Sequence, residues 1–270
     1  MEAPDAALSR ILRDIGPCLV AFSGGVDSTL LLKVAHDVLG DGATAITAVS
    51  PSLARSEREE ARFLARLIGA RHLFVETHEV DDPRYVRNDG ARCYYCKAEL
   101  FRVLRTLATE AGGRTLVYGA IADDRADDRP GMRAAEEAGV RAPLAEAGLG
   151  KDMVRRLSRR LGLPTWDKPA MACLASRVPR FVPVTRAALL RVERAEAAVR
   201  ALGYRQVRVR LQGDGARVEL DGEGLARSAR PSEGQMLIRA VLAAGFETAV
   251  IDPLGYRPGG ESRPQTAPCI

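Results

Sequence analysis

Six consecutive residues near the N-terminus, Ser23-Gly24-Gly25-Val26-Asp27-Ser28, offer the chemistry needed to bind a chain of phosphates. The two glycines let the backbone approach an anion closely and adopt positive φ. The helix expected after them would point its first N–H groups and positive dipole end at the same anion. Asp27 offers an oxygen ligand to a metal ion on the phosphates, and Ser23 and Ser28 offer hydroxyl donors. No Gly-Lys-Ser/Thr follows, so the loop is not of the Walker A type.

Short apolar runs and amphipathic stretches alternate around this loop and predict the elements that position it. Strands are expected at 18–22, 43–49, 72–76 and 115–119, and helices at 29–39, 56–68, 97–111 and 151–161. This order predicts an α/β fold, with helices on both faces of a parallel sheet. Ligands of such sheets bind beyond the carboxyl ends of the strands. Ser50 and Gly119 lie at such ends, so we expect them to join the loop in binding phosphates.

The second half of the chain predicts a smaller α+β domain. A helix at 185–202 with Thr185 as its cap, a hairpin of 206–211 and 216–220, a helix at 232–244 and a strand at 247–251 are expected. Four prolines between 164 and 183 indicate a loop. We therefore expect a first domain at 1–165, a loop at 166–183, a second domain at 184–259 and a disordered tail at 260–270.

Bulk composition limits the classes of function. The 270 residues carry a net charge of +5, which suits an anionic small molecule and does not by itself indicate nucleic acid. No apolar run is long enough to cross a bilayer, and no signal-peptide stretch is visible. The five cysteines are an odd number and are not typical of a disulfide framework. We expect a cytoplasmic protein with no membrane or nucleic-acid partner.

The glycine loop resembles the PP-loop of the ATP pyrophosphatase superfamily, which has the adenine nucleotide alpha hydrolase-like fold. Those enzymes adenylate a carboxylate or carbonyl and release pyrophosphate. A second segment, Trp166-Asp167-Lys168-Pro169-Ala170-Met171-Ala172-Cys173-Leu174-Ala175-Ser176-Arg177, resembles the sulfur-donor loop of the LarE family of ATP-dependent sacrificial sulfur transferases. Further stretches match that family in order: Arg92-Cys93-Tyr94-Tyr95-Cys96-Lys97, Asp123-Asp124, Asp128-Arg129-Pro130-Gly131, 142–149 and Gly255-Tyr256-Arg257.

The resemblance implies a function in making the nickel-pincer nucleotide, the cofactor of lactate racemase. ATP, with magnesium, would adenylate a carboxylate of a pyridinium dicarboxylate mononucleotide. The thiolate of Cys173 would displace AMP, and loss of its α-proton would expel a thiocarboxylate and leave dehydroalanine. Some family members use three cysteines and an iron–sulfur cluster, but Met171 and Ala172 precede Cys173 here, which favours the sacrificial version. The resemblance also implies a homo-oligomer.

Several residues are candidates for roles around the donor. Arg177 and Lys168 can favour the thiolate of Cys173, whose alternative role is that of a small buried hydrophobe. Lys97 is a candidate base for the α-proton, and a solvated lysine at a helix start is the alternative. Cys93 and Cys96 form a lone Cys-Xaa-Xaa-Cys pair without further ligands at metal-binding spacing, so a structural role is favoured over a metal or redox role.

Charged residues elsewhere suggest further contacts. Asp123, in a run with Asp124, Asp127 and Asp128, is a candidate magnesium ligand, and a solvated acidic loop is the alternative. Ile121 stands where the family often has asparagine. Three arginines are candidates for the substrate phosphate because their forks suit phosphate oxygens, although an exposed strand face also explains the first two: Arg208, Arg210 and Arg257. The resemblance further suggests acidic metal contacts between subunits at Glu193, Glu196 and Glu219.

Two other functions fit a PP-loop. An amidating or thiolating enzyme, such as a glutamine-dependent synthetase or a tRNA sulfurtransferase, would be expected to carry a glutaminase or nucleic-acid-binding module, and neither is apparent. A nucleotide-binding regulator could keep the loop without the chemistry. Pyrophosphate release in the presence of ATP separates the enzymes from the regulator.

Overall fold

The structure, a computed structural model, describes residues 4–126, 130–169 and 172–257. The chain divides into two compact units. The first comprises Met1–Tyr85 and Gly90–Met171, and the second comprises Val86–Asp89 and Ala172–Ile270. The predicted disordered tail, together with Asp127 and Asp128, lies outside the described residues. No described helix is both long and apolar enough to cross a membrane.

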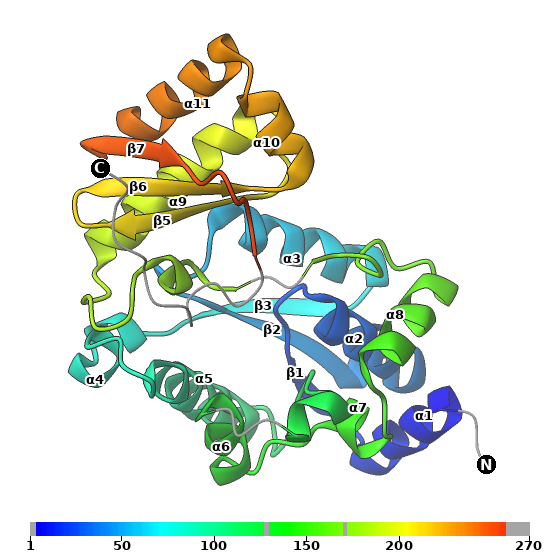
Figure 1. Cartoon of the computed structure of the whole chain (residues 1–270). Coiled ribbons are helices and arrows are strands. Elements are labelled where there is room, and N and C mark those ends of the chain that lie inside the picture. The colour runs from blue at the N-terminus through cyan, green and yellow to red at the C-terminus, as the bar shows by residue number, and fades with distance from the viewer. Residues whose placement is uncertain (1–3, 127–129, 170–171, 258–270) are drawn as a thin grey trace. The chain divides into compact units, whose positions relative to one another are not determined.

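The described strands of the first unit form a four-stranded parallel sheet in the order β3-β2-β1-β4 (Figure 1). The strands are β1 Cys18–Ala21, β2 Ala43–Val49, β3 Arg71–Glu76 and β4 Thr115–Tyr118. The helices are α1 Pro4–Ile15, α2 Val26–Leu39, α3 Arg55–Ile68, α4 Pro83–Val86, α5 Arg92–Glu110, α6 Pro130–Glu137, α7 Pro143–Glu146 and α8 Lys151–Arg160. The predicted parallel α/β sheet is confirmed.

The two faces of this sheet carry separate cores, because successive strand residues point to opposite faces. Val20 of β1 lies between Ala45 of β2 and Val117 of β4, and all three join the core formed with α1, α2, α3, α7 and α8. Leu19 and its neighbours face the other core, which α5 and α6 complete. Because α2 and α3 lie on one face and α5 on the other, the connections reverse between β1 and β4. A crevice for ligands is expected at that point.

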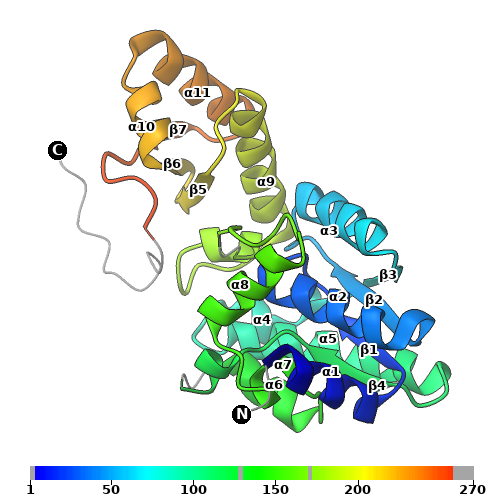
Figure 2. The same cartoon turned by 90° about the vertical axis from the view of Figure 1, so that its right-hand side faces the viewer.

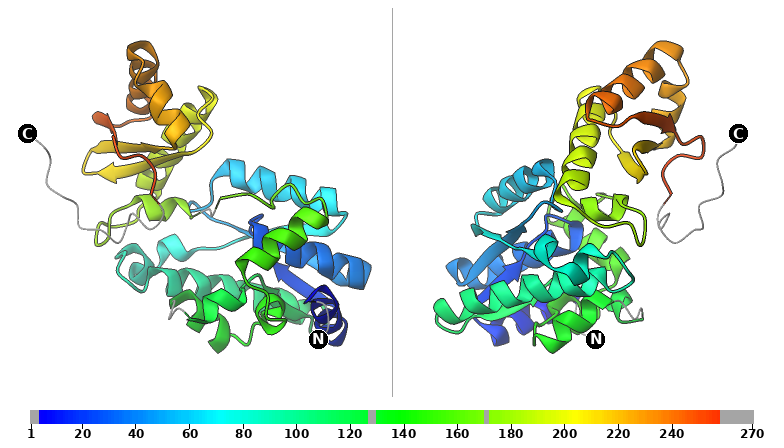
Figure 3. Two further views of the ribbon diagram at one scale, coloured as in Figure 1. Left: turned by 45° about the vertical axis from the view of Figure 1, so that its right-hand side comes forward. Right: turned by 90° about the vertical axis from the view of Figure 1, so that its left-hand side faces the viewer.

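The second unit is a small α+β structure (Figures 2 and 3). Its strands are β5 Val207–Gln212, β6 Gly215–Leu220 and β7 Thr248–Ile251, in the order β5-β6-β7. The first two form the predicted antiparallel hairpin, and β7 runs parallel to β6. The helices are α9 Arg186–Ala201, α10 Gly222–Ser228 and α11 Pro231–Ala243. Thr185 caps α9 as predicted, since its hydroxyl accepts a 3.1 Å bond from the Ala188 N–H.

Helix α5 begins five residues before the predicted start, at Arg92 in place of residue 97. Its first turns therefore contain the Cys93–Cys96 pair. The residues of this pair and the two tyrosines between them favour helix only weakly, so packing in the folded unit must decide the conformation. Helices α1, α4, α6, α7 and α10 were also not predicted. Helix α10 illustrates the reason. Its cap, Asp221, can be recognised in the sequence, but two of its first three residues are glycines, which disfavour helix.

His72 on β3 is held neutral inside the first unit. Its Nε2 lies 2.8 Å from the Thr47 hydroxyl, which itself donates to the Phe22 carbonyl at 2.7 Å. The hydroxyl therefore accepts from a protonated Nε2. Burial, helped by the charge of Arg62, lowers the pKa of His72 to about 4.

Acidification is expected to destabilise the protein through His72. Below pH 6.5 the unfolded chain protonates this imidazole, whereas the folded chain does so only near pH 4. The histidine's contribution to stability is therefore complete above pH 6.5 and declines as the pH falls to 4. Between pH 7 and pH 4 we expect wild type to lose about 2 kcal/mol more free energy of unfolding than His72→Gln, allowing for partial solvent contact. Urea titrations measure this difference.

His78→Gln is the control, because its imidazole is exposed. This variant should follow wild type at every pH. Equal losses in wild type and His72→Gln would contradict the assignment of a buried neutral imidazole.

Candidate active site

A cavity of about 270 Å³ lies at the carboxyl ends of β1, β2 and β4 in the first unit. Its lining combines the glycine loop with residues from distant parts of the chain. The predicted residues that it brings together are Ser23, Gly25, Asp27, Ser28, Gly119 and Lys97. The position between β1 and β4 is the crevice expected from the fold.

The glycine loop is closed on itself by its two serines. The Ser23 and Ser28 hydroxyls are 3.1 Å apart, and the Ser28 hydroxyl donates to the Gly25 carbonyl at 3.3 Å. Gly24 has φ of +69°, a conformation that favours glycine. Gly25 is the N-cap of α2 and has no side chain to satisfy the first amides of the helix. Those N–H groups are suited to an anion in the cavity.

Gly119 is required by packing. A Cβ at this position would lie 2.9 Å from the Ser28 nitrogen and 3.1 Å from its Cα. Only glycine therefore lets the end of β4 approach the start of α2 so closely. Its contact with ATP stays a prediction.

Asp27 faces a lysine that sequence reasoning did not identify. The Lys151 Nζ donates to both Asp27 carboxylate oxygens, at 2.9 and 2.8 Å. The backbone N–H of Lys151 donates to Asp123 at 2.7 Å, so Asp123 lies at the start of α8. The sequence feature that could have indicated Lys151 is its position directly after Gly150, at the start of a predicted helix. Asp27 and Asp123, the two predicted magnesium ligands, thus both contact Lys151.

A magnesium ion carried by ATP fits Asp27 better than Asp123. Among the described residues, no group of three or more His, Cys, Asp or Glu could hold a metal by itself. Magnesium commonly binds through one or two carboxylates, with phosphates and water completing the shell. The Asp27 carboxylate lines the cavity, whereas Asp123 is engaged with the backbone of α8.

Ser50 is bound to a buried carboxylate that the sequence did not indicate. Its hydroxyl donates to Glu79 at 2.5 Å, and the Ser52 hydroxyl donates to the same oxygen at 2.9 Å. Glu79 is buried. Since the Ser50 proton is directed at this carboxylate, Ser50 orders the loop after β2, and its contact with ATP stays a prediction.

The cysteines differ in accessibility. Cys173 and Cys93 are exposed, Cys96 is partly buried, and Cys18 is buried. Burial raises the pKa of Cys18 to about 11, which removes it as a nucleophile. The fifth cysteine, Cys269, lies outside the described residues.

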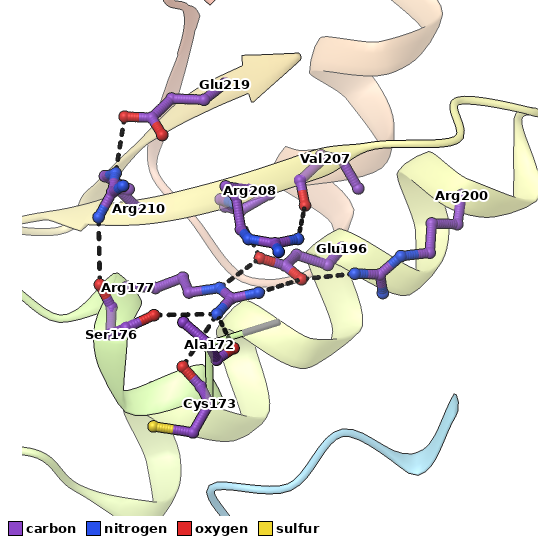
Figure 4. Close-up of polar contacts among 11 residues, drawn as sticks. Ala172, Cys173, Ser176, Arg177, Glu196, Arg200, Val207, Arg208, Arg210 and Glu219 are labelled. Atoms are coloured by element: carbon purple, nitrogen blue, oxygen red, sulfur yellow. Dashed lines mark hydrogen bonds and ion pairs between the residues drawn. The ribbon is translucent and has the colours of Figure 1, made fainter. Parts of the chain in front are cut away.

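The backbone around Cys173 is held by Arg177 in the second unit (Figure 4). This guanidinium, 2% exposed, donates to the carbonyls of Ala172 and Cys173, the latter at 2.9 Å. It also forms an ion pair of 2.8 Å with Glu196 on α9. Figure 4 shows the Cys173 sulfur pointing away from the guanidinium. Arg177 therefore holds the main chain of the loop, and its effect on the Cys173 thiolate stays a prediction.

Glu196 anchors this arrangement to the second unit. It is fully buried and also binds Arg200 at 2.7 Å and the Val209 N–H at 3.1 Å. Burial acts to raise the pKa of Glu196, but the charges and hydrogen bonds of Arg177 and Arg200 outweigh it, so the pKa lies below its ordinary value. Glu196 is therefore the counter-ion of two arginines, and its role as a metal ligand between subunits stays a prediction.

Lys168 has contacts within the first unit that the sequence did not indicate. Its ammonium donates to the Gly24 carbonyl at 3.0 Å and pairs with Glu60 at 2.7 Å. Its effect on the Cys173 thiolate stays a prediction. Lys97 lies in the first unit and Cys173 in the second, so proton transfer between them stays a prediction.

The strand face of β5 is not exposed, contrary to the alternative interpretation of its arginines. Arg208 is 5% exposed and donates to the Val207 carbonyl at 3.0 Å. Burial lowers its pKa, and the nearby Arg177 charge adds to the effect. Arg210 donates to the Ser176 carbonyl at 3.1 Å and to Glu219 at 2.6 Å. The donor loop thus covers this face.

These ion pairs form one cluster in the described part of the second unit. Arg217 binds both Glu219 and Asp252, and Arg257 binds Asp252 at 3.3 Å. Glu219 is buried beside two arginines, which makes it a poor ligand for a metal shared with another subunit. Glu193 lies one turn before Glu196 on α9 and is half-buried. Five arginines form ion pairs with three carboxylates, and Arg208 lies near enough to feel the charge of Glu196, so the group carries an excess of three positive charges.

Comparison with known proteins identifies the family. The chain is 45% identical over 263 residues to an uncharacterized protein of Synechocystis sp., covering 97% of this chain and 98% of that protein. It is 36% identical over 259 residues to the pyridinium-3,5-bisthiocarboxylic acid mononucleotide synthase of Lactiplantibacillus plantarum, covering 94% and 92%. A glutamine-hydrolyzing GMP synthase chain of Methanopyrus kandleri is 28% identical over 174 residues, 59% of this chain and 55% of that protein. No protein-family model matches the chain.

The GMP synthase similarity agrees with a PP-loop fold. The similarity to the mononucleotide synthase extends through both units. Since it spans almost all of both proteins at more than one-third identity, the chain belongs to the LarE family, the family of the pyridinium-3,5-bisthiocarboxylic acid mononucleotide synthase.

Proposed function

We propose that this protein is an ATP-dependent sulfurtransferase that acts on pyridinium-3,5-dicarboxylic acid mononucleotide and donates the sulfur of its own Cys173. The product class is the thiocarboxylate named for the relative from Lactiplantibacillus plantarum. The main support is that identity over 94% of the chain, which includes both the glycine loop and the donor loop. We further propose that the protein acts as a homo-oligomer in nickel-pincer nucleotide synthesis.

The first half-reaction is adenylation of the substrate carboxylate. Its oxygen attacks the α-phosphorus of ATP, and pyrophosphate leaves. The amides at the start of α2 would bind the phosphates, and Asp27 would hold a magnesium ion carried by ATP, which would neutralise part of the phosphate charge. Lys151, 2.8 Å from Asp27, would hold the Asp27 carboxylate in place beside the phosphates. The site thus needs one carboxylate and one ammonium side by side.

The second half-reaction transfers sulfur. The Cys173 thiolate attacks the activated carbonyl, a C–S bond forms, and AMP leaves with the electrons of the broken C–O bond. A base then takes the Cys173 α-proton, and the Cβ–S bond breaks with its electrons moving to sulfur. Thiocarboxylate departs and dehydroalanine remains. Lys97 is our candidate base, because it lines the nucleotide cavity.

The arginine cluster of the second unit is the proposed site for the substrate phosphate. Its positive charge exceeds that of the three carboxylates, and arginine binds phosphate oxygens in a fork. The Arg257 side chain is 40% exposed, against 13% for Arg210, so Arg257 is the more accessible of the two to a ligand. Arg210 supports the donor loop through the Ser176 carbonyl, and both Arg208 and Arg210 add to the positive potential.

Purified protein given ATP, magnesium and the mononucleotide should release one pyrophosphate for each carboxylate activated and form a thiocarboxylate. Pyrophosphate is measured by a coupled assay and the product by mass spectrometry. Pyrophosphate release with an amidated product would indicate an amidating enzyme instead. No pyrophosphate release with this or any other carboxylate would support a nucleotide-binding regulator.

A further inference from the structure

The peptide between Gly24 and Gly25 is restrained from outside the loop by Lys168. The Lys168 Nζ donates to the Gly24 carbonyl at 3.0 Å, and the same ammonium pairs with Glu60 of α3 at 2.7 Å. The lysine side chain is 15% exposed, so water competes little for it. This is a charge-assisted hydrogen bond, which is stronger than a neutral one.

The carbonyl and the amide of this peptide point in opposite directions, because the bond is trans and planar. Holding the Gly24 oxygen toward Lys168 therefore turns the Gly25 N–H to the other side of the peptide plane. Ser23 accepts from that N–H at 3.4 Å, a long contact. Both Ser23 and Gly25 line the nucleotide cavity. Lys168 thus turns a backbone donor toward the Ser23 hydroxyl, at the lining of the cavity where phosphates are proposed to bind.

A peptide between two glycines needs such a restraint. Glycine lacks a Cβ, so the plane of this peptide can rotate with little steric cost. The 3.4 Å contact to Ser23 is too long to fix it. The charged contact from Lys168 is shorter and comes from a segment that is itself fixed.

The segment that carries Lys168 is anchored by α8. Arg155 donates to the Trp166 carbonyl at 2.9 Å and to the Lys168 carbonyl at 3.0 Å. The Arg159 guanidinium lies 4.9 Å from the centre of the Trp166 ring. The backbone that leads to the lysine is therefore held, and its ammonium has a defined place from which to reach Gly24.

We propose that Lys168 is a positioning residue of the phosphate site, which orients the Gly25 N–H for the ATP phosphates. The proposal deepens the proposed function and rests on it for the identity of the ligand. It assigns Lys168 no contact with ATP. The lysine acts through the Gly24–Gly25 peptide. Without the lysine, this peptide would be free to rotate, and the Gly25 N–H would no longer be oriented for the phosphates.

The test compares Lys168→Met with Lys168→Gln and Lys168→Arg. Binding of a non-hydrolysable ATP analogue is measured by calorimetry. The resonance of the Gly25 amide is measured by NMR on the ligand-free protein. We expect Lys168→Met to weaken binding by about tenfold to a hundredfold and to shift the Gly25 amide. Lys168→Arg should keep most of the affinity, and Lys168→Gln, which retains a neutral donor, should be intermediate.

Lys33→Met is the matched control, because it removes a lysine of α2 that pairs with Asp37, away from the glycine loop. It should bind the analogue like wild type. Thermal melts identify any variant that fails to fold, and the proposal is then judged on the variants that do fold. Wild-type affinity in Lys168→Met with an unmoved Gly25 amide would overturn the proposal. Failure of wild type to bind the analogue would instead refute the proposed function, while the Gly25 amide still reports on Lys168.

Discussion

Cys173→Ala is expected to form no thiocarboxylate while still releasing pyrophosphate. The glycine loop and Asp27 belong to the first unit and are untouched by the change, so the carboxylate is still activated. Without a thiolate the adenylate has no sulfur nucleophile. Wild-type protein should lose the mass of one hydrogen sulfide per chain, at Cys173, and product should stop at one sulfur per chain. Intact-protein and peptide mass spectrometry measure both.

Cys93→Ala and Cys96→Ala serve as controls for this prediction. Both cysteines lie in the first turns of α5, and each variant should retain a single turnover if the thiols are structural. Repeated turnover by wild type with no added sulfur source, and with Cys173 intact at the end, would refute sacrificial chemistry. Loss of sulfur from Cys96 instead would move the donor to the first unit.

Asp27→Asn is expected to reduce adenylation by about a hundredfold or more, because the carboxylate would supply charge stabilisation of several kcal/mol through the cation that it is proposed to hold. Asparagine preserves the shape of the side chain and should leave the fold intact. It also leaves the Lys151 ammonium without its partner at 2.8 Å. The rate of pyrophosphate release at saturating substrate measures the loss.

Asp37→Asn is the matched control, since this aspartate also pairs with a lysine but lies at the far end of α2. It should release pyrophosphate at the wild-type rate. Unchanged adenylation in Asp27→Asn, with a wild-type dependence on magnesium, would show that the cation is held elsewhere.

The parts of the fold that could be predicted depend on local pattern. Strand β2 was predicted to the residue because its β-branched residues are bounded by clear turns. The glycine loop was also identified, since its chemistry is contained in six neighbouring residues. Both rest on short-range sequence information.

The parts that could not be predicted depend on contacts between distant residues. Lys151 meets Asp27 from 124 positions away, and only the packing of α8 against α2 brings them together. The alternation along β5 indicated a solvent face for Arg208, but the donor loop covers that face. Whether a charged side chain on a strand is buried depends on the segment that packs over that face of the sheet. The sequence of the strand itself does not show which segment that is.

The way Arg177 holds the donor loop has a consequence for the protein after it has reacted. Its guanidinium binds carbonyl oxygens and Glu196, and these groups all survive when Cys173 becomes dehydroalanine. The spent chain should therefore stay folded and keep its nucleotide and phosphate sites. Such a chain would compete with fresh protein for the mononucleotide. A cell that uses the protein as a reagent must then either supply it in excess or degrade what has been used.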